Sequence, residues 1–451
     1  MLWKTIVLCL SLASAAAAQT PDMQLTPAQM RGLAAQAVNK GYASEALALS
    51  GALLDRDPND FDALMVHARA ARDLGQFDAA RVSAQQAWNV ASGDEQRYAA
   101  AVANAQVLSS MGKRTSAQLW LRRAVQTAPS DFHKGMAARD YAYVRSQNPW
   151  STQLSFNIAP SSNINNGSSS ETTTLPGLPF VFQLQGAAQA LSGTEISGGI
   201  STTYKLAESK TRRTALRLSV YHRDFILSDE ARRKAPGAKG SDFALTSLTT
   251  GLDQSWIRQN GRLVLGAEAT LGKVFYSGDP LYANLNLGGS VRYAFTPGLL
   301  GQFRAAREAQ KGYGTRPDAH AWRGSVGLTT VLPQGHRLST SFNYAEGSSS
   351  ADYLDYADHE IDLRLELAKP VLSTAIELGL TAGHKHHARN AVTGGERNDD
   401  TVQGDVTLVF NKLDYYGFVP SLTLRARRTD SNVGIYDSEE FGLQAGIRSR
   451  F

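Results

Sequence analysis

The sequence has little cysteine, little charge and no long apolar run beyond its first residues. Its 451 residues include a single cysteine, Cys9, and 19% of them are charged. After the first twenty residues, no apolar stretch approaches the ~18 residues that a membrane-spanning helix needs. The sequence therefore excludes a helical membrane protein. It does not exclude a membrane β-barrel, because barrel strands are apolar on one face only.

The first eighteen residues have the three parts of a secretory signal peptide. Lys4 is the positive charge, the apolar core runs from Ile6 to Leu12, and three alanines precede Gln19. Cys9 is too early, and Leu8 too large, for a lipoprotein anchor. The mature chain would have no cysteine, and hence no disulfide and no thiolate chemistry. The net charge of +5 is mild, and secretion argues against a nucleic-acid partner.

Residues 19–146 predict a periplasmic helical domain. Gly41 and Gly75 are 34 residues apart, Gly112 follows 37 residues later, and each lies between two apolar-periodic segments. Small residues recur at fixed distances from these glycines, and a helix-ending residue follows each by seventeen positions. These residues are Ala34, Ala68, Ala105, Ala46, Ala80, Ala117, Pro58, Ser92 and Pro129. The spacing resembles tetratricopeptide repeats, which pair helices in units of about 34 residues.

An array of this kind forms a concave groove for an extended or helical peptide. Polar residues of the first helices are the candidates for its lining, namely Gln36, Asn39, His67 and Asn104. A final capping helix is expected over 132–144. The alternative is an alanine-rich helical bundle whose periodicity arises by chance.

Residues 147–451 predict a transmembrane β-barrel. Pro149 ends the last helix because it disfavours a helical residue before it, and Trp150 suits a membrane–water boundary. Fourteen segments then alternate between apolar and polar residues, with apolar side chains expected to face lipid and charged ones a wet lumen. They cover 152–158, 194–206, 212–225, 243–258, 262–275, 282–295, 299–309, 320–332, 336–345, 359–368, 373–387, 401–411, 418–428 and 439–451.

The last segment is a candidate barrel-assembly signal. Phe441, Leu443, Ile447 and the terminal Phe451 occupy odd positions, and polar residues fill most of the even ones. A strand that alternates in this way and ends on phenylalanine is typical of bacterial outer-membrane barrels.

The connections predict which side of the membrane each chain end occupies. Short turns alternate with longer polar loops, as in outer-membrane barrels, and we expect this alternation to be strict. An even strand number places both chain ends on the periplasmic side. A soluble β-sandwich is the alternative, but it has no need of such asymmetry.

Residues 159–192 form the longest connection. It contains an Asn/Ser-rich turn region followed by an apolar patch with two prolines. From composition alone, an ordinary flexible external loop is the simplest interpretation.

The sequence contains no pattern that predicts catalysis. It has no nucleophile elbow, phosphate-binding glycine loop or zinc-type spacing. His384 and His386 could share one strand face, but a solvated strand end explains them better than a metal site. The row from Glu360 to Glu366 could be an acid/base site, but charges that pair across a lumen are commoner. We expect no enzyme activity, no cofactor and no metal.

A family resemblance rests on the start of the barrel. Its carriers are Trp150, the segment 159–165 with Asn163, Ile164 and Asn165, the segment Gly177, Leu178, Pro179 and Phe180, and Ser192-Gly193. With the signal peptide, helical repeats and carboxy-terminal barrel, these residues resemble the surface lipoprotein assembly modifier family, whose members are described as having a fourteen-stranded barrel. The helical domain departs from the family, because it is short and alanine-rich and its repeats are degenerate.

The resemblance implies an outer-membrane translocon. Such a protein delivers client lipoproteins, or in some members soluble secreted proteins, to the cell surface. Its implied partners are the client, outer-membrane lipids, the barrel-assembly machinery and periplasmic chaperones. Two alternatives stay open: an exopolysaccharide exporter, and a porin-like channel with a periplasmic helical domain.

Overall fold

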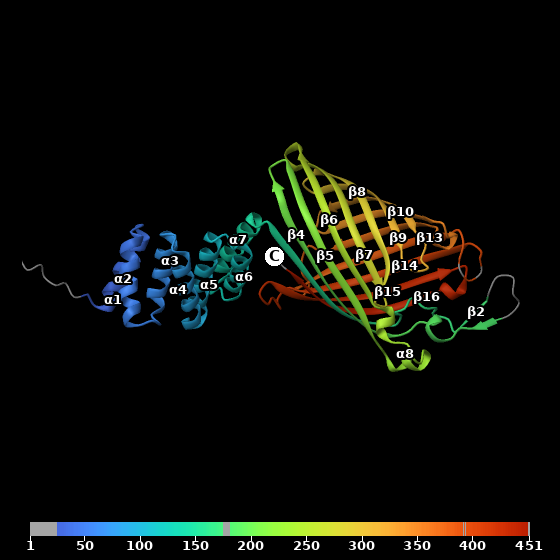
Figure 1. Cartoon of the computed structure of the whole chain (residues 1–451), viewed down its shortest axis with the longest axis horizontal. Coiled ribbons are helices and arrows are strands. Elements are labelled where there is room, and N and C mark those ends of the chain that lie inside the picture. The colour runs from blue at the N-terminus through green and yellow to red at the C-terminus, as the bar shows by residue number, and fades with distance from the viewer. Residues whose placement is uncertain (1–24, 175–180, 391, 393, 450–451) are drawn as a thin grey trace, which may run out of the picture. The chain divides into compact units, whose positions relative to one another are not determined.

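The computed structural model describes residues 25–174, 181–390, 392 and 394–449. The chain divides into two compact units, Met1–Ala137 and Ala138–Phe451. Helices build the first unit and a closed β-barrel dominates the second (Figure 1). The predicted signal peptide lies outside the described residues.

Helices stack in consecutive pairs along the first unit, as the repeat predicts. The short turns within the pairs contain Gly41, Gly75 and Gly112, whose φ angles of 84°, 76° and 73° favour glycine. Among the described residues, no helix is both long and apolar enough to cross a membrane. The helices before the barrel are α1 Pro27–Asn39, α2 Ala43–Arg56, α3 Phe61–Asp73, α4 Phe77–Val90, α5 Gly93–Ser110, α6 Arg114–Gln126 and α7 Asp131–Gln147.

Small side chains let these helices approach one another closely. All six alanines of the repeat positions are buried, with exposed fractions of 2% or less. Helices α2, α4 and α6 end shortly before Pro58, Ser92 and Pro129, as predicted, and the expected capping helix is α7. The degenerate repeat therefore still builds paired helices, because the alanines at the helix contacts are retained.

One ion pair connects the first two repeats. Asp60 caps α3 by accepting a hydrogen bond from the Ala63 amide at 3.1 Å. Its other carboxylate oxygen accepts from Arg31 Nε of α1 at 2.7 Å. Because Asp60 is buried and Arg31 is half-exposed, the pair fixes the start of α3 against α1.

Fourteen strands close into an antiparallel barrel in the order of the sequence, with β1 joined to β16. All fourteen predicted strands are present. The strands are β1 Trp150–Ser161, β4 Gly193–Glu208, β5 Arg212–Leu227, β6 Leu245–Arg258, β7 Leu263–Tyr276, β8 Asp279–Thr296, β9 Leu299–Gly312, β10 Ala319–Val331, β11 Arg337–Ser349, β12 Tyr356–Glu366, β13 Thr374–His387, β14 Arg397–Phe410, β15 Phe418–Ser431 and β16 Ser438–Ser449.

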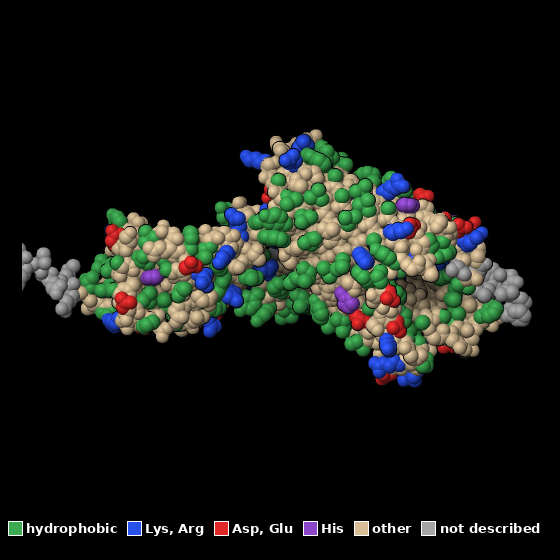
Figure 2. Space-filling view, viewed as in Figure 1, with side chains coloured by type: hydrophobic (Ala, Val, Ile, Leu, Met, Phe, Trp, Pro, Cys, Tyr) green, Lys and Arg blue, Asp and Glu red, His purple; other side chains and the backbone are tan. Residues whose placement is uncertain are grey.

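The outer wall of the barrel is apolar. Leu154, Leu271 and Val326 are 64%, 58% and 57% exposed. A water-soluble protein rarely exposes large apolar side chains over such a wide surface. Figure 2 shows hydrophobic side chains spread over the barrel wall on the face in view. Closure pairs β1 with β16, so within the described residues the barrel sheet has no outermost strand, as a hydrocarbon environment demands.

The predicted strict alternation of short and long connections is wrong at three hairpins. On the short-turn side, seven residues join β12 to β13 and seven join β14 to β15, more than the six that join β11 to β12 or β15 to β16 on the long-loop side. On the long-loop side, only Ser277 and Gly278 connect β7 and β8. Both residues have positive φ angles, 53° and 88°, as in a two-residue hairpin turn. The strands extend further than the apolar alternation, so the polar residues after Phe275 belong to the ladder.

Candidate functional site

Alternation along each strand places polar side chains in the barrel lumen. On β12, Ile361 and Leu363 are exposed on the outer wall. Asp362 on the opposite face accepts hydrogen bonds from Asn343 at 2.6 Å and Thr381 at 2.7 Å. Because successive side chains point to opposite faces, the strand separates a lipid-facing surface from a hydrogen-bonded interior.

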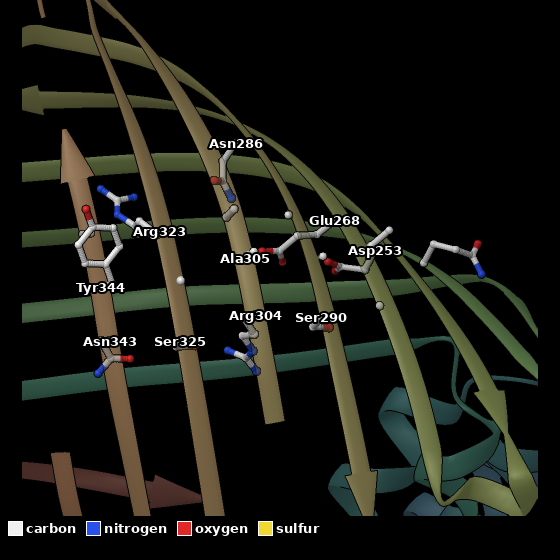
Figure 3. A pocket seen from close by; sticks show the side chains of 18 of the residues that line it. Asp253, Glu268, Asn286, Ser290, Arg304, Ala305, Arg323, Ser325, Asn343 and Tyr344 are labelled. Carbon is white, nitrogen blue, oxygen red and sulfur yellow. The ribbon is translucent and has the colours of Figure 1, made fainter. Parts of the chain in front are cut away.

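A cavity of about 740 Å³ lies along the lumenal side of strands β5 to β12. Figure 3 shows Asp253 and Glu268 projecting from neighbouring strands. Arg217 pairs with both carboxylates, with its Nε 3.0 Å from Asp253 Oδ2 and its Nη2 3.5 Å from Glu268 Oε2. The cavity wall therefore carries charges of both signs at this point, with one guanidinium shared between two carboxylates.

Glu308 is the centre of a second group in the lumen. Its side chain is buried and pairs with Arg323. Asn284 and Gln310 each donate an amide hydrogen bond to Glu308 Oε1, at 3.1 and 3.0 Å. A buried carboxylate needs partners of this kind, and here β9 itself and the neighbouring strands β8 and β10 supply them.

The row from Glu360 to Glu366 is part of this network of lumenal charges. Arg364 pairs with Asp405 at 3.6 Å, and Glu366 pairs with Arg337 at 3.2 Å. This arrangement is that of structural ion pairs. Whether the chain has enzyme activity is not tested by these ion pairs, so its absence stays a prediction.

The histidines near the long-loop end bind neighbours on β14. His384 lies 2.8 Å from Asp400 and His386 lies 2.9 Å from Asn398. Within the part of the chain that the structure describes, no three His, Cys, Asp or Glu side chains are grouped to hold a metal ion.

The described part of the first long connection is folded, which contradicts the interpretation as an ordinary flexible loop. Asn165 donates to the Ala187 and Gln189 carbonyls at 2.8 and 3.0 Å and accepts from the Leu191 amide at 2.9 Å. Asn163 bonds to Gly167 in both directions at 2.9 Å. The connection also contains β2 Thr172–Thr174 and β3 Val181–Gln183, which pair with each other.

Ile164 anchors this connection in an apolar cluster. It is 8% exposed and belongs to a cluster with Leu191, Phe225, Leu227, Ala231 of α8 Asp229–Lys234 and Ala235, which follows that helix. The Ile164 amide also donates to the Leu191 carbonyl at 2.8 Å. Composition could not reveal this order, because the partners lie up to 71 residues along the chain. Gly177, Leu178, Pro179 and Phe180 lie outside the described residues.

Trp150 starts the barrel where the sequence predicts. Its amide donates a hydrogen bond to Asn148 Oδ1 at 3.1 Å, and its ring centroid lies 4.6 Å from that of Tyr204 on β4. The indole is 48% exposed. This aromatic pair is typical of an interfacial girdle.

The last strand presents its apolar side outward. Phe441 and Ile447 are exposed, and Leu443 lies opposite Leu424 of β15 on the same face. On its other side, β16 pairs with Asn157, Ile158 and Ser161 of β1 among the described residues. Phe451 lies outside them, so its role as an assembly signal stays a prediction.

The helical groove candidates separate into two kinds. Gln36 and Asn39 are exposed on α1, and Asn39 accepts a hydrogen bond from Arg69 of α3 at 2.8 Å. Asn104 is 2% exposed and donates to the Ala84 and Ala100 carbonyls. Its prediction as a groove residue is therefore wrong, because its amide is used inside the helix packing.

His67 also turns toward the helix packing. Its Nδ1 lies 2.9 Å from Ser83 Oγ of α4, and burial lowers the pKa of the imidazole below its usual value. The sequence reasoning missed Arg69 and Arg72, which bridge the stacked first helices to Asn39 and Gln106. Their spacing on α3 could have placed both on one exposed face.

Neither a known protein-family profile nor a curated protein sequence matches the chain. Among solved structures, a loop-L8 deletion mutant of OmpT from Vibrio cholerae gives a TM-score of 0.36 at 11% identity, covering 66% of this chain and 99% of that one. OccAB3 of Acinetobacter baumannii gives 0.36 at 9%, covering 66% and 98%. The first TPR domain of human RPAP3 gives 0.24 at 16%, covering 27% and 93%.

These similarities carry no argument about function. The fold is that of an outer-membrane β-barrel preceded by a helical region, because fourteen antiparallel strands close around a polar lumen and present an apolar wall.

Proposed function

We propose that this chain is an outer-membrane translocon that helps deliver client lipoproteins or secreted proteins to the bacterial cell surface. The observation that carries the proposal is the role of Asn163, Ile164 and Asn165. These residues carry the resemblance to surface lipoprotein assembly modifiers, and they organise the folded connection at one end of the barrel. Their side chains form hydrogen bonds and apolar contacts within the connection, as expected of residues that together hold one folded segment.

The helical unit fits a periplasmic receiving role. Its stacked first helices carry polar side chains that Arg69 and Arg72 join across three repeats. A surface of this kind suits an extended client segment or a client-bound chaperone. As an outer-membrane barrel, the second unit would contact outer-membrane lipids and would be inserted by the barrel-assembly machinery.

Two other functions remain as alternatives. An exopolysaccharide exporter would use the lumen for a sugar chain, and a porin-like channel would use it for small solutes. The abundance of paired charges in the lumen, such as Arg217 with Asp253, is compatible with either. Neither alternative gives the helical unit a protein ligand.

The test is surface protease shaving of intact cells with and without the gene, with released peptides read by mass spectrometry. We expect one or two lipoproteins or secreted proteins to leave the exposed fraction while staying in the total extract. Unchanged surface proteins would overturn the proposal and direct attention to polysaccharide export and solute flux.

Complementation with a chain lacking residues 19–146, the signal peptide retained, tests the helical unit. We expect a folded barrel without export. A double variant, Arg69→Ala with Arg72→Ala, tests the exposed face more finely, and Arg81→Ala on α4 is its matched control. Full export by the shortened chain would show that the helical unit is dispensable.

A further inference from the structure

A second cavity, of about 260 Å³, lies in the barrel beside the folded first connection. Three arginines line it, Arg223 from β5 and Arg425 and Arg427 from β15, together with Glu195 and Glu440. The strands that contribute them lie on both sides of β1 and β16, where the barrel closes. The cavity therefore forms only when the barrel closes, because strands from both sides of the closure line it.

Arg223 has a donor that its protein surroundings do not satisfy. Its Nε is buried and has no hydrogen-bond partner among the described residues. The guanidinium carbon lies 5.7 Å from the ring of Phe225, which the apolar cluster around Ile164 holds in place. A buried donor without a partner destabilises the protein, so an acceptor in the cavity would be favoured.

Arg425 and Arg427 present further donors. They are two residues apart on β15 and therefore share its lumenal face. Their register partners on β16 are Gly442 and Glu440. Among the described residues, neither arginine forms an ion pair or a side-chain hydrogen bond, although Arg427 lies close enough to Glu360 of β12 to attract it electrostatically. This distinguishes them from Arg217, Arg323 and Arg364, each of which pairs with a carboxylate.

The carboxylates of the cavity do not balance these charges. Three arginines face two glutamates, and Glu440 already accepts a hydrogen bond from Ser161 Oγ at 3.0 Å. Guanidinium groups bind the oxygens of carboxylates and phosphates with paired donors. The cavity volume suits one such group and excludes a folded domain.

We propose that this cavity is an oxyanion-binding site, which takes a carboxylate or phosphate group beside the first connection. The source of the group is either an acidic side chain of a polypeptide in the lumen or a phosphorylated small molecule. This proposal does not depend on translocation, and binding at the site can be measured without an export assay.

The test is isothermal titration of the purified full chain in detergent micelles at low ionic strength. One titration uses inorganic phosphate and another uses glutarate, a dicarboxylate. We expect saturable binding of at least one probe, and the probe that binds more tightly identifies the source. Arg223→Gln and the double variant Arg425→Gln/Arg427→Gln should each weaken it at least tenfold, which corresponds to about 1.4 kcal/mol.

Arg304→Gln is the matched control, because Arg304 lines the separate cavity of Figure 3. It should leave binding unchanged. Absence of saturable binding by the wild-type chain would overturn the proposal, and so would equal weakening by Arg304→Gln. Heat-modifiable migration checks that each variant is folded. If Arg223→Gln does not fold, Arg223→Lys keeps the charge, loses the paired donors and should still weaken binding.

Discussion

Arg364 on β12 and Asp405 on β14 form an ion pair at 3.6 Å across the intervening strand β13. The residue between them is Gly379, the register partner of both. A Cβ at Gly379 would lie 2.4 Å from Asp405 Oδ1. The ion pair therefore depends on the absence of a side chain at this position.

Gly379→Ala should displace the Asp405 carboxylate and destabilise the barrel by about 1–3 kcal/mol, the usual range for overpacking. Urea unfolding of the full chain in detergent measures the change. Gly404→Ala is the control, because a Cβ at Gly404 has no atom within 4 Å. Equal midpoints for the two variants would contradict the role of Gly379.

Asn165→Ala should loosen the first connection without unfolding the barrel. The substitution removes the side chain that bonds to Ala187, Gln189 and Leu191, and each lost bond costs about 1 kcal/mol. Limited proteolysis should cut the connection faster than in the wild-type chain. Gln183→Ala, which alters an exposed residue of β3, should leave the rate unchanged, and a similar rate for Asn165→Ala would contradict the prediction.

His67 should make the helical unit sensitive to acid. Its pKa is lowered in the folded chain by burial, so the unfolded chain takes up the proton first as the pH falls. The stabilising contribution of neutral His67 is present above about pH 6.5 and is lost below it. Thermal unfolding of the full chain followed at 222 nm should show the helical transition moving to lower temperature between pH 7.5 and 5.5.

His67→Gln keeps a polar group near Ser83 and cannot be protonated in this range. In this variant, the part of the shift that His67 causes should disappear. His133→Gln is the matched control, because that histidine bonds to Ser130 on an exposed surface. If His67→Gln shifts with pH as much as the wild-type chain does, the titration of His67 is not the cause.

Leu443→Arg should impair the barrel because Leu443 lies on the outer face near the middle of β16. A charge at the midplane of the membrane costs about 2–4 kcal/mol. Heat-modifiable migration of outer-membrane fractions measures the loss. Gln444→Arg faces the lumen and loses one hydrogen bond to Asn157, so it should assemble nearly normally; equal defects would argue against a lipid-facing β16.

Phe451→Asp tests the assembly signal at the carboxy-terminus. We expect less folded barrel in the outer membrane and more degradation, because the terminal strand both closes the barrel and marks it for insertion. The amount of heat-modifiable protein measures this, with Ser449→Thr as a conservative control. Normal assembly of Phe451→Asp would rule out an essential role for the terminal residue.

Local patterns in the sequence determined the two-part architecture. Alternation over segments such as 359–368 predicts each strand, and the spacing of Gly41, Gly75 and Gly112 predicts the helix pairs. Both signals are periodic patterns among neighbouring residues, so they can be recognised in the sequence without knowing which distant residues are in contact. The same local patterns predicted the outward faces of Phe441 and Ile447.

Tertiary structure alone decided how separate segments use their polar residues. Asn104 looked like a groove residue, but its amide is committed to the Ala84 carbonyl on another helix. The connection after β1 looked flexible, but Ile164 packs against Phe225 and Leu227, more than sixty residues away. Arg223, Arg425 and Arg427 meet only because the barrel closes. Such contacts depend on strand order and closure, which bring together residues that no local periodicity relates.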